Sequence, residues 1–168
     1  MTGERRTARL DLRPITPRVA AALLLERELA ARLLGATLPP EWPQPDLVDI
    51  LPILAAADPE PARFGAWAMV ERVSNSVVGD AGFLGPPQDG TVEIGFSVLP
   101  DRRRRGYATE AVRTLLDWVL QQPGVRGLVA RSDADNLGSA GVLERAGFVR
   151  TGEADGTVTW TFIPEAGP

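Results

Sequence analysis

The pattern of apolar side chains in residues 91–133 constrains the fold more than any other part of the sequence. In residues 92–98 every second side chain is apolar, as in a half-buried strand. From about 105 to 122 the apolar residues recur three and four apart, which predicts an amphipathic helix. Residues 125–133, VRGLVARSD, predict a further strand. A strand, a helix and a strand in this order predict a right-handed crossover between two parallel strands.

The N-terminal segment predicts one strand followed by one helix. Apolar and charged residues alternate over 8–12, and Pro14 closes the strand. Thr16 can cap a helix that has Pro17 at its first position and stops at Gly35. The buried stripe of this helix is predicted from three leucines spaced four apart: Leu25, Leu29 and Leu33.

A proline-rich segment, residues 38–61, separates this helix from the strands that follow. It contains a short apolar helix, from Asp46 to about Ala57, which Pro52 is expected to bend or split. We interpret the segment as a mobile flap that carries Trp42.

The remaining segments predict two hairpins and a short helix. The strands AWAMVERV and VVGDAGFLG meet at a Ser-Asn-Ser turn. The helix in NLGSAGVLERAG ends at Gly147, and the last hairpin turns at Asp155 and Gly156. With 168 residues and no internal repeat or linker, the chain is expected to fold as one domain.

The composition excludes several kinds of chemistry. The sequence has no cysteine and no histidine. Their absence excludes a cysteine nucleophile, a serine-histidine-aspartate triad, a zinc finger and a histidine acid or base. Catalysis would therefore use carboxylates, hydroxyls, the single tyrosine, backbone amides or water.

Charge and hydropathy bear on partners and location. The formal net charge is -4, although every basic residue is an arginine, so a general nucleic-acid-binding role is not expected. Residues 1–10 have no apolar core region, and the most apolar helix is interrupted by charges, so neither a signal peptide nor a membrane span is expected. We expect a cytoplasmic protein with no membrane partner and no nucleic-acid partner, and a homodimer is left open.

The segment DRRRRGYATEA, residues 101–111, predicts an anion site. A turn of arginines and glycine leads from a strand into a helix N-terminus, where free backbone N–H groups and the helix dipole favour an anion. Gly106 permits a positive φ and the close approach of a phosphate. The alternative is that residues 102–105 form a solvated loop. The segment matches neither the glycine fingerprint of dinucleotide sites nor the P-loop signature.

Four segments resemble the GNAT family of N-acetyltransferases. VLPDRRRRGYATEA is similar to the family's acyl-CoA-binding motif, Arg/Gln-x-x-Gly-x-Gly/Ala, with Arg103, Gly106 and Ala108 at the defined positions. RLDLRPIT resembles the usual first strand, EIGFSVLP the fourth, and DNLGSAGVLERAGF the last helix of the motif set. In order and spacing these segments are similar to the branch that includes the ribosomal-protein N-terminal acetyltransferases.

The resemblance implies a fold and a ligand. It implies an α/β (α+β) fold, as a single GNAT domain over 8–165 with about four helices. The sheet would be mixed, mostly antiparallel and seven-stranded, with its fourth and fifth strands splayed around the pantetheine arm of acetyl-CoA. No metal is implied. The residues that the resemblance assigns to acetyl-CoA are Val98, Arg103, Arg105, Gly106, Tyr107, Ala108 and Asn136.

The resemblance leaves the catalytic groups open. Many members have a tyrosine acid on the last helix, and Leu143 stands at that position here. Ser139 is the candidate to donate a hydrogen bond to the leaving sulfur, and the alternative is that it caps or packs its short helix. Glu93, a carboxylate in an apolar strand, is the candidate to accept the amine proton directly or through water. It could equally be an acid on a solvated face; Asp80 and Glu110 are the other candidates.

The leading hypothesis is an acetyl-CoA-dependent N-acetyltransferase that acts on a primary amine, either a small molecule or a protein N-terminus. Because there is no cysteine to carry the acetyl group, we expect direct attack within a ternary complex. Trp42 and Trp67 could line an acceptor pocket, although tryptophan lies more often in a core. The alternatives are a catalytically silent acyl-CoA-binding or sensor domain, and an RNA-associated module that uses the arginine run.

Overall fold

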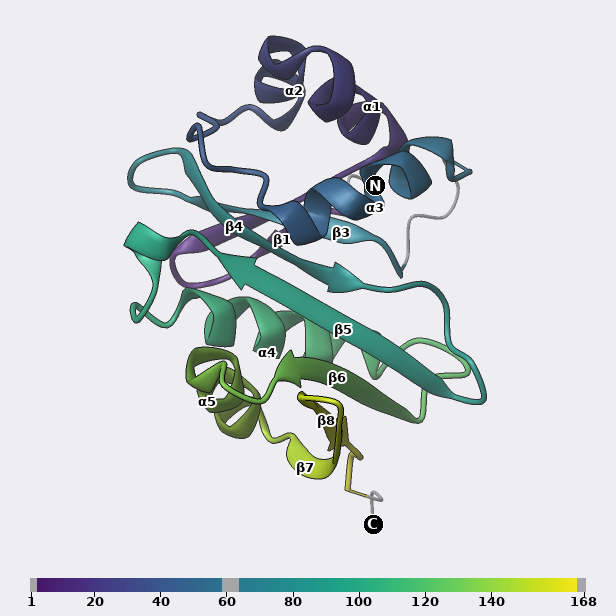
Figure 1. Ribbon diagram of the computed structural model, residues 1–168. Coiled ribbons are helices and arrows are strands. Elements are labelled where there is room, and N and C mark those ends of the chain that lie inside the picture. Colours follow the sequence, from purple (N-terminus) through teal and green to yellow (C-terminus); the bar gives the residue numbers. More distant parts are fainter. Residues whose placement is uncertain (1–2, 59–63, 166–168) are drawn as a thin grey trace.

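Eight strands form one mixed sheet in the computed structural model, which describes residues 3–58 and 64–165 (Figure 1). Their order across the sheet is β1-β2-β3-β4-β5-β6-β8-β7. Every neighbouring pair is antiparallel except β5 and β6. The strands are β1 (Arg5–Arg6), β2 (Leu10–Pro14), β3 (Ala66–Glu71), β4 (Ser76–Phe83), β5 (Thr91–Val98), β6 (Gly127–Asp133), β7 (Val149–Ala154) and β8 (Thr157–Phe162).

The parallel pair at the centre of the sheet confirms the predicted crossover. Strands β5 and β6 are joined by α4 (Tyr107–Val119), after a short 3₁₀ turn at Pro100–Arg102. The two strands pair over only three positions, from Thr91 opposite Gly127 to Glu93 opposite Val129. Both strands continue beyond that point without pairing to each other, so the sheet opens there.

Helices cover both faces of the sheet. α1 (Pro17–Leu25), α2 (Arg27–Leu34) and α3 (Pro45–Ala56) lie on one face, and α4 and α5 (Leu137–Ala146) lie on the other (Figure 1). Within the described residues there are therefore five α-helices and eight strands, where about four helices and seven strands were predicted. The additional strand is the two-residue β1.

The additional helix arises because the first predicted helix breaks at Glu26. Thr16 caps α1 as expected, with its side chain accepting from the amide of Val19. Glu26 then leaves the helical region (φ -151°, ψ 82°), and a new helix begins. The predicted leucine stripe is wrong, because Leu25 at the end of α1 is 87% exposed and Leu29 and Leu33 on α2 are only half-buried. The side chains that α1 and α2 bury are Val19, Ala20, Ala22, Ala30 and Leu34.

The interpretation of residues 38–61 as a mobile flap is wrong at Trp42. This side chain is fully buried, in a cluster with Leu47 and Leu51 of α3. α3 also continues through Pro52, which lies on its exposed side. There the carbonyl that loses its helical partner can bond to water. The last part of this segment, residues 59–63, is outside the described residues.

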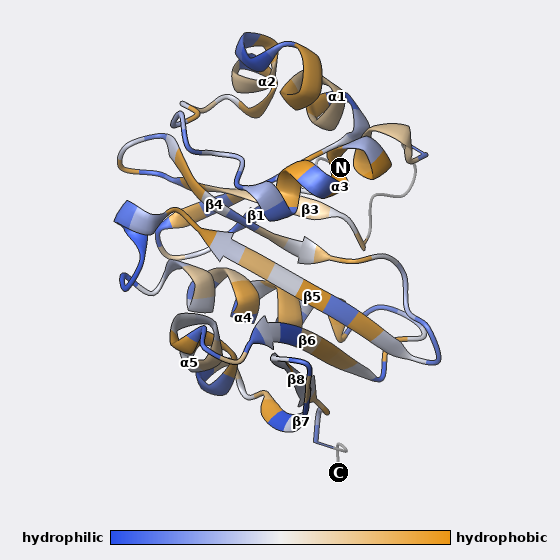
Figure 2. Cartoon of the chain, viewed as in Figure 1, coloured by the Kyte–Doolittle hydropathy of each residue, from blue (hydrophilic) through white to orange (hydrophobic). Residues whose placement is uncertain are grey.

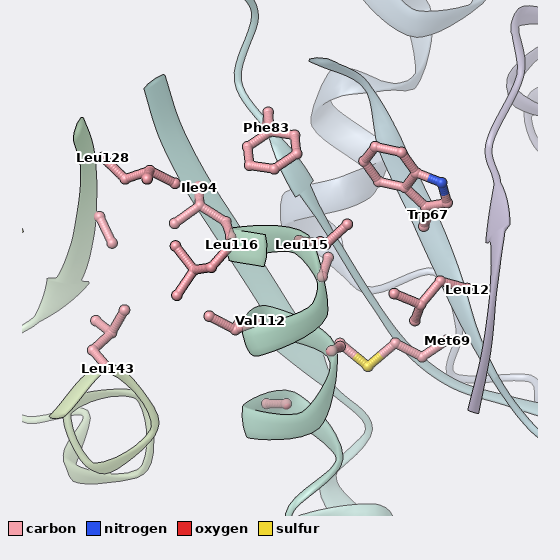
Figure 3. Close-up of a cluster of buried hydrophobic side chains, with 14 of the residues drawn as sticks. Leu12, Trp67, Met69, Phe83, Ile94, Val112, Leu115, Leu116, Leu128 and Leu143 are labelled. Atoms are coloured by element: carbon pink, nitrogen blue, oxygen red, sulfur yellow. The ribbon is translucent and has the colours of Figure 1, made fainter. Parts of the chain in front are cut away.

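The main core lies between α4 and the sheet. Figure 2 shows the alternation of apolar and polar residues along β5, which gives one face of that strand to the core. Val112, Leu115 and Leu116 of α4 pack against this face (Figure 3). Trp67 lies in the same cluster, and with Trp42 buried opposite, both tryptophans belong to the core. At about 25 cal/mol for each Å² of apolar surface removed from water, these contacts dominate the stability of the fold.

The predicted C-terminal elements are confirmed. α5 ends at Gly147, whose φ of 99° satisfies the left-handed cap. β7 and β8 form a hairpin with Asp155 (φ 52°) and Gly156 (φ 78°) at the turn, as the Asp-Gly pair predicts. None of the helices among the described residues combines the length and apolarity that crossing a membrane requires.

Candidate functional site

A groove of about 710 Å³ lies where β5 and β6 separate. It is lined by the ends of these two strands and by the N-terminal ends of α3, α4 and α5. Three helix N-termini thus converge on one space, and each presents backbone N–H groups and the positive end of a helix dipole. The lining residues used below are Gln44, Asp46, Ser97, Val98, Arg102, Arg103, Arg105, Gly106, Tyr107, Ala108, Asp133, Asn136 and Ser139.

The turn before α4 has the geometry of an anion site. Arg104 (φ 64°) and Gly106 (φ 83°) both have left-handed backbones, and Gly106 is the N-cap of α4. No side chain caps this helix, so its first amides remain available to a ligand. Arg9 supports the turn from below, donating to the carbonyl of Arg105 at 2.7 Å. The prediction that this turn opens a helix is confirmed.

Three arginines of the run bond to the protein itself, and Arg105 does so by donating to the carbonyl of Asp101 at 3.3 Å. Arg102 forms an ion pair with Glu71 at 3.3 Å, and the Nε of Arg103 donates to the carbonyl of Val98 at 3.0 Å. The run is therefore partly structural and not wholly solvated.

Tyr107 is buried beneath the turn and is already engaged. Its hydroxyl donates a hydrogen bond to Glu71, and the guanidinium of Arg9 lies 4.4 Å from its ring centroid. Burial raises the pKa of Tyr107, and the bond to Glu71 raises it further. The same hydroxyl is the main cause that lowers the pKa of Glu71. The proton therefore stays on the tyrosine.

The start of α5 forms the opposite wall of the groove. Asn136 caps this helix, with its side-chain oxygen accepting from the amide of Ser139 at 3.0 Å. Ser139 is half-buried, and within the described chain no group bonds to its hydroxyl. Leu143, one turn further along, is 1% exposed and points into the core (Figure 3). Of these two residues, Ser139 has a free hydroxyl at the groove, whereas Leu143 belongs to the core.

The structure brings together eight of the nine residues predicted for the site, and Glu93 is the exception. Glu93 is half-buried, does not line the groove, and forms an ion pair with Arg131 on β6. Glu110, another candidate acid, lies in the first turn of α4, where it accepts hydrogen bonds from Thr7 and Arg9.

The sequence did not predict the end of the groove formed by α3. There the hydroxyl of Ser97 on β5 donates to the side-chain oxygen of Gln44, just before α3. Asp46 in the first turn of α3 lies beside them. The alternation along β5 places Ser97 on the face away from α4, but nothing in the sequence indicates that Gln44 meets it from 53 residues away.

Asp80 lies behind this end of the groove. It pairs with Ser97 across β4 and β5, and its carboxylate accepts a hydrogen bond from the indole Nε1 of Trp42 at 3.0 Å. Burial raises the pKa of Asp80 to about 7; the bond from Trp42 opposes the rise, and the charge of Asp46 adds to it. Among residues 3–58 and 64–165, no group of three or more carboxylates is placed to hold a metal ion.

Comparison with known proteins identifies relatives that are acetyltransferases. The family model described as the acetyltransferase (GNAT) domain matches residues 9–149. An N-acetyltransferase of Bacillus subtilis (strain 168), YjdG, which is described as uncharacterized, is 32% identical over 161 residues. The match covers 94% of this chain and 96% of that protein.

Two solved structures show the same fold. The ribosomal-protein-S5-alanine acetyltransferase from Vibrio fischeri superposes with a TM-score of 0.63 at 16% identity, over 95% of this chain and 96% of that one. The microcin C7 self-immunity acetyltransferase MccE, solved in complex with acetyl-CoA and AMP, gives a TM-score of 0.64 at 16% identity, over 94% and 93%.

Proposed function

Because this chain belongs to the GNAT acetyltransferase family, we propose that it transfers the acetyl group of acetyl-CoA to a primary amine. The observation that carries the proposal is the groove between β5 and β6, which has an uncapped helix N-terminus at one end and a carboxylate-bearing end at the other. The first end suits a phosphate group, and the second suits a cationic amine.

The pyrophosphate of acetyl-CoA would bind at the turn before α4. The backbone amides of Arg103, Arg105, Gly106, Tyr107 and Ala108 would hold it there. Two features support this placement: the first amides of α4 lack a side-chain cap, and Gly106, which has no Cβ, adopts the left-handed φ of the turn without side-chain bulk.

The pantetheine arm would follow the opening between the two strands. Beyond Glu93, β5 has no strand neighbour on its β6 side, so the N–H of Val98 is available to the arm, whereas the carbonyl of Val98 accepts from Arg103. Asn136 would contact the arm from α5, since its side chain lines the groove while capping that helix.

The chemistry would be direct attack of the amine on the thioester. The amine nitrogen bonds to the carbonyl carbon, the carbon–sulfur bond breaks, and the sulfur leaves as a thiolate that takes a proton. Ser139 would donate a hydrogen bond to that sulfur, because its hydroxyl is free. We retain Glu93 as a group that helps to attract the cationic acceptor, since its pairing with Arg131 makes it less available as a base.

The acceptor class can be tested directly. Purified protein is mixed with acetyl-CoA and a panel of amines, including peptides with free N-termini, polyamines, amino acids and aminoglycosides, and free thiol is measured. The structural likeness to a ribosomal-protein-S5-alanine acetyltransferase is the reason to include N-terminal peptides. We expect thiol release that depends on one class of amine, with matching acetyl incorporation by mass spectrometry.

A silent acyl-CoA-binding domain is the second candidate, because buried Leu143 stands where the family commonly has an acid. It predicts tight CoA binding by calorimetry without thiol release for any amine. An RNA-associated module predicts instead an RNA affinity that falls steeply with salt.

A further inference from the structure

Two carboxylates are buried in the described part of the chain, and their surroundings differ. Asp11 is 8% exposed and Asp80 is 9% exposed. Asp11 is paired with three arginines at 3.1 to 3.5 Å: Arg6, Arg13 and Arg72. No arginine of the described residues pairs with Asp80.

This difference needs an explanation, because a buried carboxylate without a counter-charge is costly to keep ionised. The half-buried acids follow the rule, with Glu71 paired to Arg102, Glu93 to Arg131 and Glu110 to Arg9. With 18 arginines in the chain, partners are available. Asp80 is therefore either kept protonated or placed to meet a cation from outside the protein.

The position of Asp80 indicates that this cation would come from the groove. Its cross-strand neighbour Ser97 lines the groove, on the face of the sheet where α3 lies. Paired side chains on neighbouring strands lie about 5 Å apart. Asp80 is thus one strand away from the α3 end of the groove, the end opposite the arginine turn.

Trp42 fixes the carboxylate and leaves part of it free. The indole Nε1 donates to Oδ2 of Asp80, and no donor in the described chain reaches Oδ1. Trp42 is itself fully buried, so this bond is shielded from bulk water. One oxygen is oriented by the protein, and the other can accept a proton.

We propose that Asp80 is the group that receives the proton of the acceptor ammonium, through a water molecule at the α3 end of the groove. This inference rests on the proposed function, because it assigns a role in that reaction. The step is balanced: the ammonium loses one proton to the carboxylate and becomes a free amine, which attacks the thioester. The second proton on nitrogen passes to the departing thiolate, and Asp80 returns its proton to solvent.

The charges around Asp80 are consistent with this role. Asp46 on α3 is the charged neighbour that raises the pKa of Asp80. Arg13 shares the face but donates to the end of α2 and to Asp11, while Arg27 donates to backbone carbonyls around Trp42. With a pKa of about 7, Asp80 lies close to an α-amino group at about 8 and about three units below a lysine-type amine.

The test compares the parent with Asp80→Asn, which keeps an oxygen for Trp42 but cannot take up a proton. At neutral pH we expect kcat/KM for the amine to fall about 100-fold. The fall should shrink as the pH approaches the pKa of the amine. The parent profile should show an inflection near the pKa of Asp80 that Asp80→Asn lacks, and the Kd for CoA should be unchanged by calorimetry.

Two further variants serve as a matched control and as an independent test of the role of Asp80. Asp49→Asn makes the same chemical change at an exposed position of α3 outside the groove, and should keep the parent profile. Trp42→Phe removes a hydrogen bond that lowers the pKa of Asp80, so the inflection should move to higher pH. This shift would be visible even if Asp80→Asn failed to fold.

The outcomes separate this inference from the proposed function. If the parent acetylates an amine but Asp80→Asn gives a parallel pH profile, Asp80 is a structural acceptor for Trp42 and the inference is overturned. An inflection that stays in place in Trp42→Phe overturns it equally. If the parent releases no thiol with any amine, the proposed function fails, and the role of Asp80 fails with it.

Discussion

The hydroxyl of Tyr107 donates a hydrogen bond to Glu71, which joins the first residue of α4 to the last residue of β3. The turn that would hold pyrophosphate is therefore attached to the sheet from beneath. Ser74 and Arg102 also donate to Glu71, so this carboxylate organises the base of the turn.

Removing the hydroxyl should weaken the fold and change its response to acid. We expect Tyr107→Phe to lower the free energy of unfolding by about 1–3 kcal/mol at neutral pH, because Glu71 loses a donor. The folded-state pKa of Glu71 is lowered, so its stabilising contribution is present above the unfolded pKa and is lost as pH falls through the folded value. Urea denaturation at several pH values should show that acidification lowers the free energy of unfolding less in the variant than in the parent. Parallel plots of this free energy against pH would contradict the role assigned to the bond between Tyr107 and Glu71.

Gly106→Val should weaken CoA binding by more than about tenfold, because a β-branched residue resists a φ of 83° and adds bulk at the turn. Gly156→Val is the matched control: its φ is 78°, but it lies in the β7–β8 turn with open space around it. Both variants should lose stability, and only Gly106→Val should lose CoA affinity by calorimetric titration. Unchanged affinity in a folded Gly106→Val protein would remove the pyrophosphate from this turn.

Ser139→Ala should lower kcat by about tenfold and leave the Kd for CoA nearly intact, since a bond to the leaving sulfur strengthens only as charge develops. The control is Ser132→Ala, which removes a serine hydroxyl on β6 that does not line the groove. Equal turnover in Ser139→Ala and the parent would return Ser139 to a structural role in α5.

Glu93→Gln should reduce acetylation at limiting amine by about two- to fivefold, because the negative charge that favours a cationic acceptor is lost. The effect should appear in KM, and it should be stronger at low salt because salt screens the attraction between charges. The pairing of Glu93 with Arg131 accounts for its small size. Steady-state kinetics at two ionic strengths would measure it. A KM unaffected by the substitution at both would place Glu93 outside the acceptor site.

Asp80→Asn should stabilise the protein above neutral pH. The folded-state pKa of Asp80 is raised to about 7, so the folded state holds this proton more tightly than the unfolded chain. Parental stability therefore falls as pH rises from about 4 to about 7, by at most about 4 kcal/mol from this group. Thermal unfolding should show a higher Tm for Asp80→Asn at pH about 8, with the difference vanishing near pH about 4.

Asp11→Asn is the contrasting variant, because it removes the counter-charge of three arginines. We expect it to destabilise the protein by about 1–3 kcal/mol at the same pH. A loss of stability in both variants would show that Asp80 is not an uncompensated buried charge.

The elements with a clear period were predictable from the sequence. The alternation of β5, the three-and-four spacing of α4 and the Asp-Gly turn of the last hairpin are local patterns, and all three were confirmed. The break at Glu26 was not predicted, because neither glycine nor proline marks it. The leucine stripe failed with it, because Leu25 ends α1 at the break and is exposed there.

The groove was half predictable for a related reason. Its arginine turn lies within one short segment, and the family resemblance identified that segment. Its α3 end depends on contacts between distant residues: Trp42 meets Asp80 across 38 residues, and Gln44 meets Ser97 across 53. No local sequence pattern encodes such a contact, and the sequence alone therefore places Trp42 in a flap.

The short ladder between β5 and β6 has a mechanical consequence. The two halves of the sheet, β1–β5 and β6–β8, are connected by three residue pairs and by the α4 crossover. Past Glu93, the side of β5 that faces β6 is an unpaired strand edge in the middle of the sheet. An edge of this kind has unpaired N–H and C=O groups that accept an additional extended chain. A ligand arm bound there would act as a removable strand that closes the seam, so loading the groove should stiffen the whole sheet. The amides of Phe96 and Val98, which face this opening, would then exchange with solvent more slowly in the loaded protein than in the empty one.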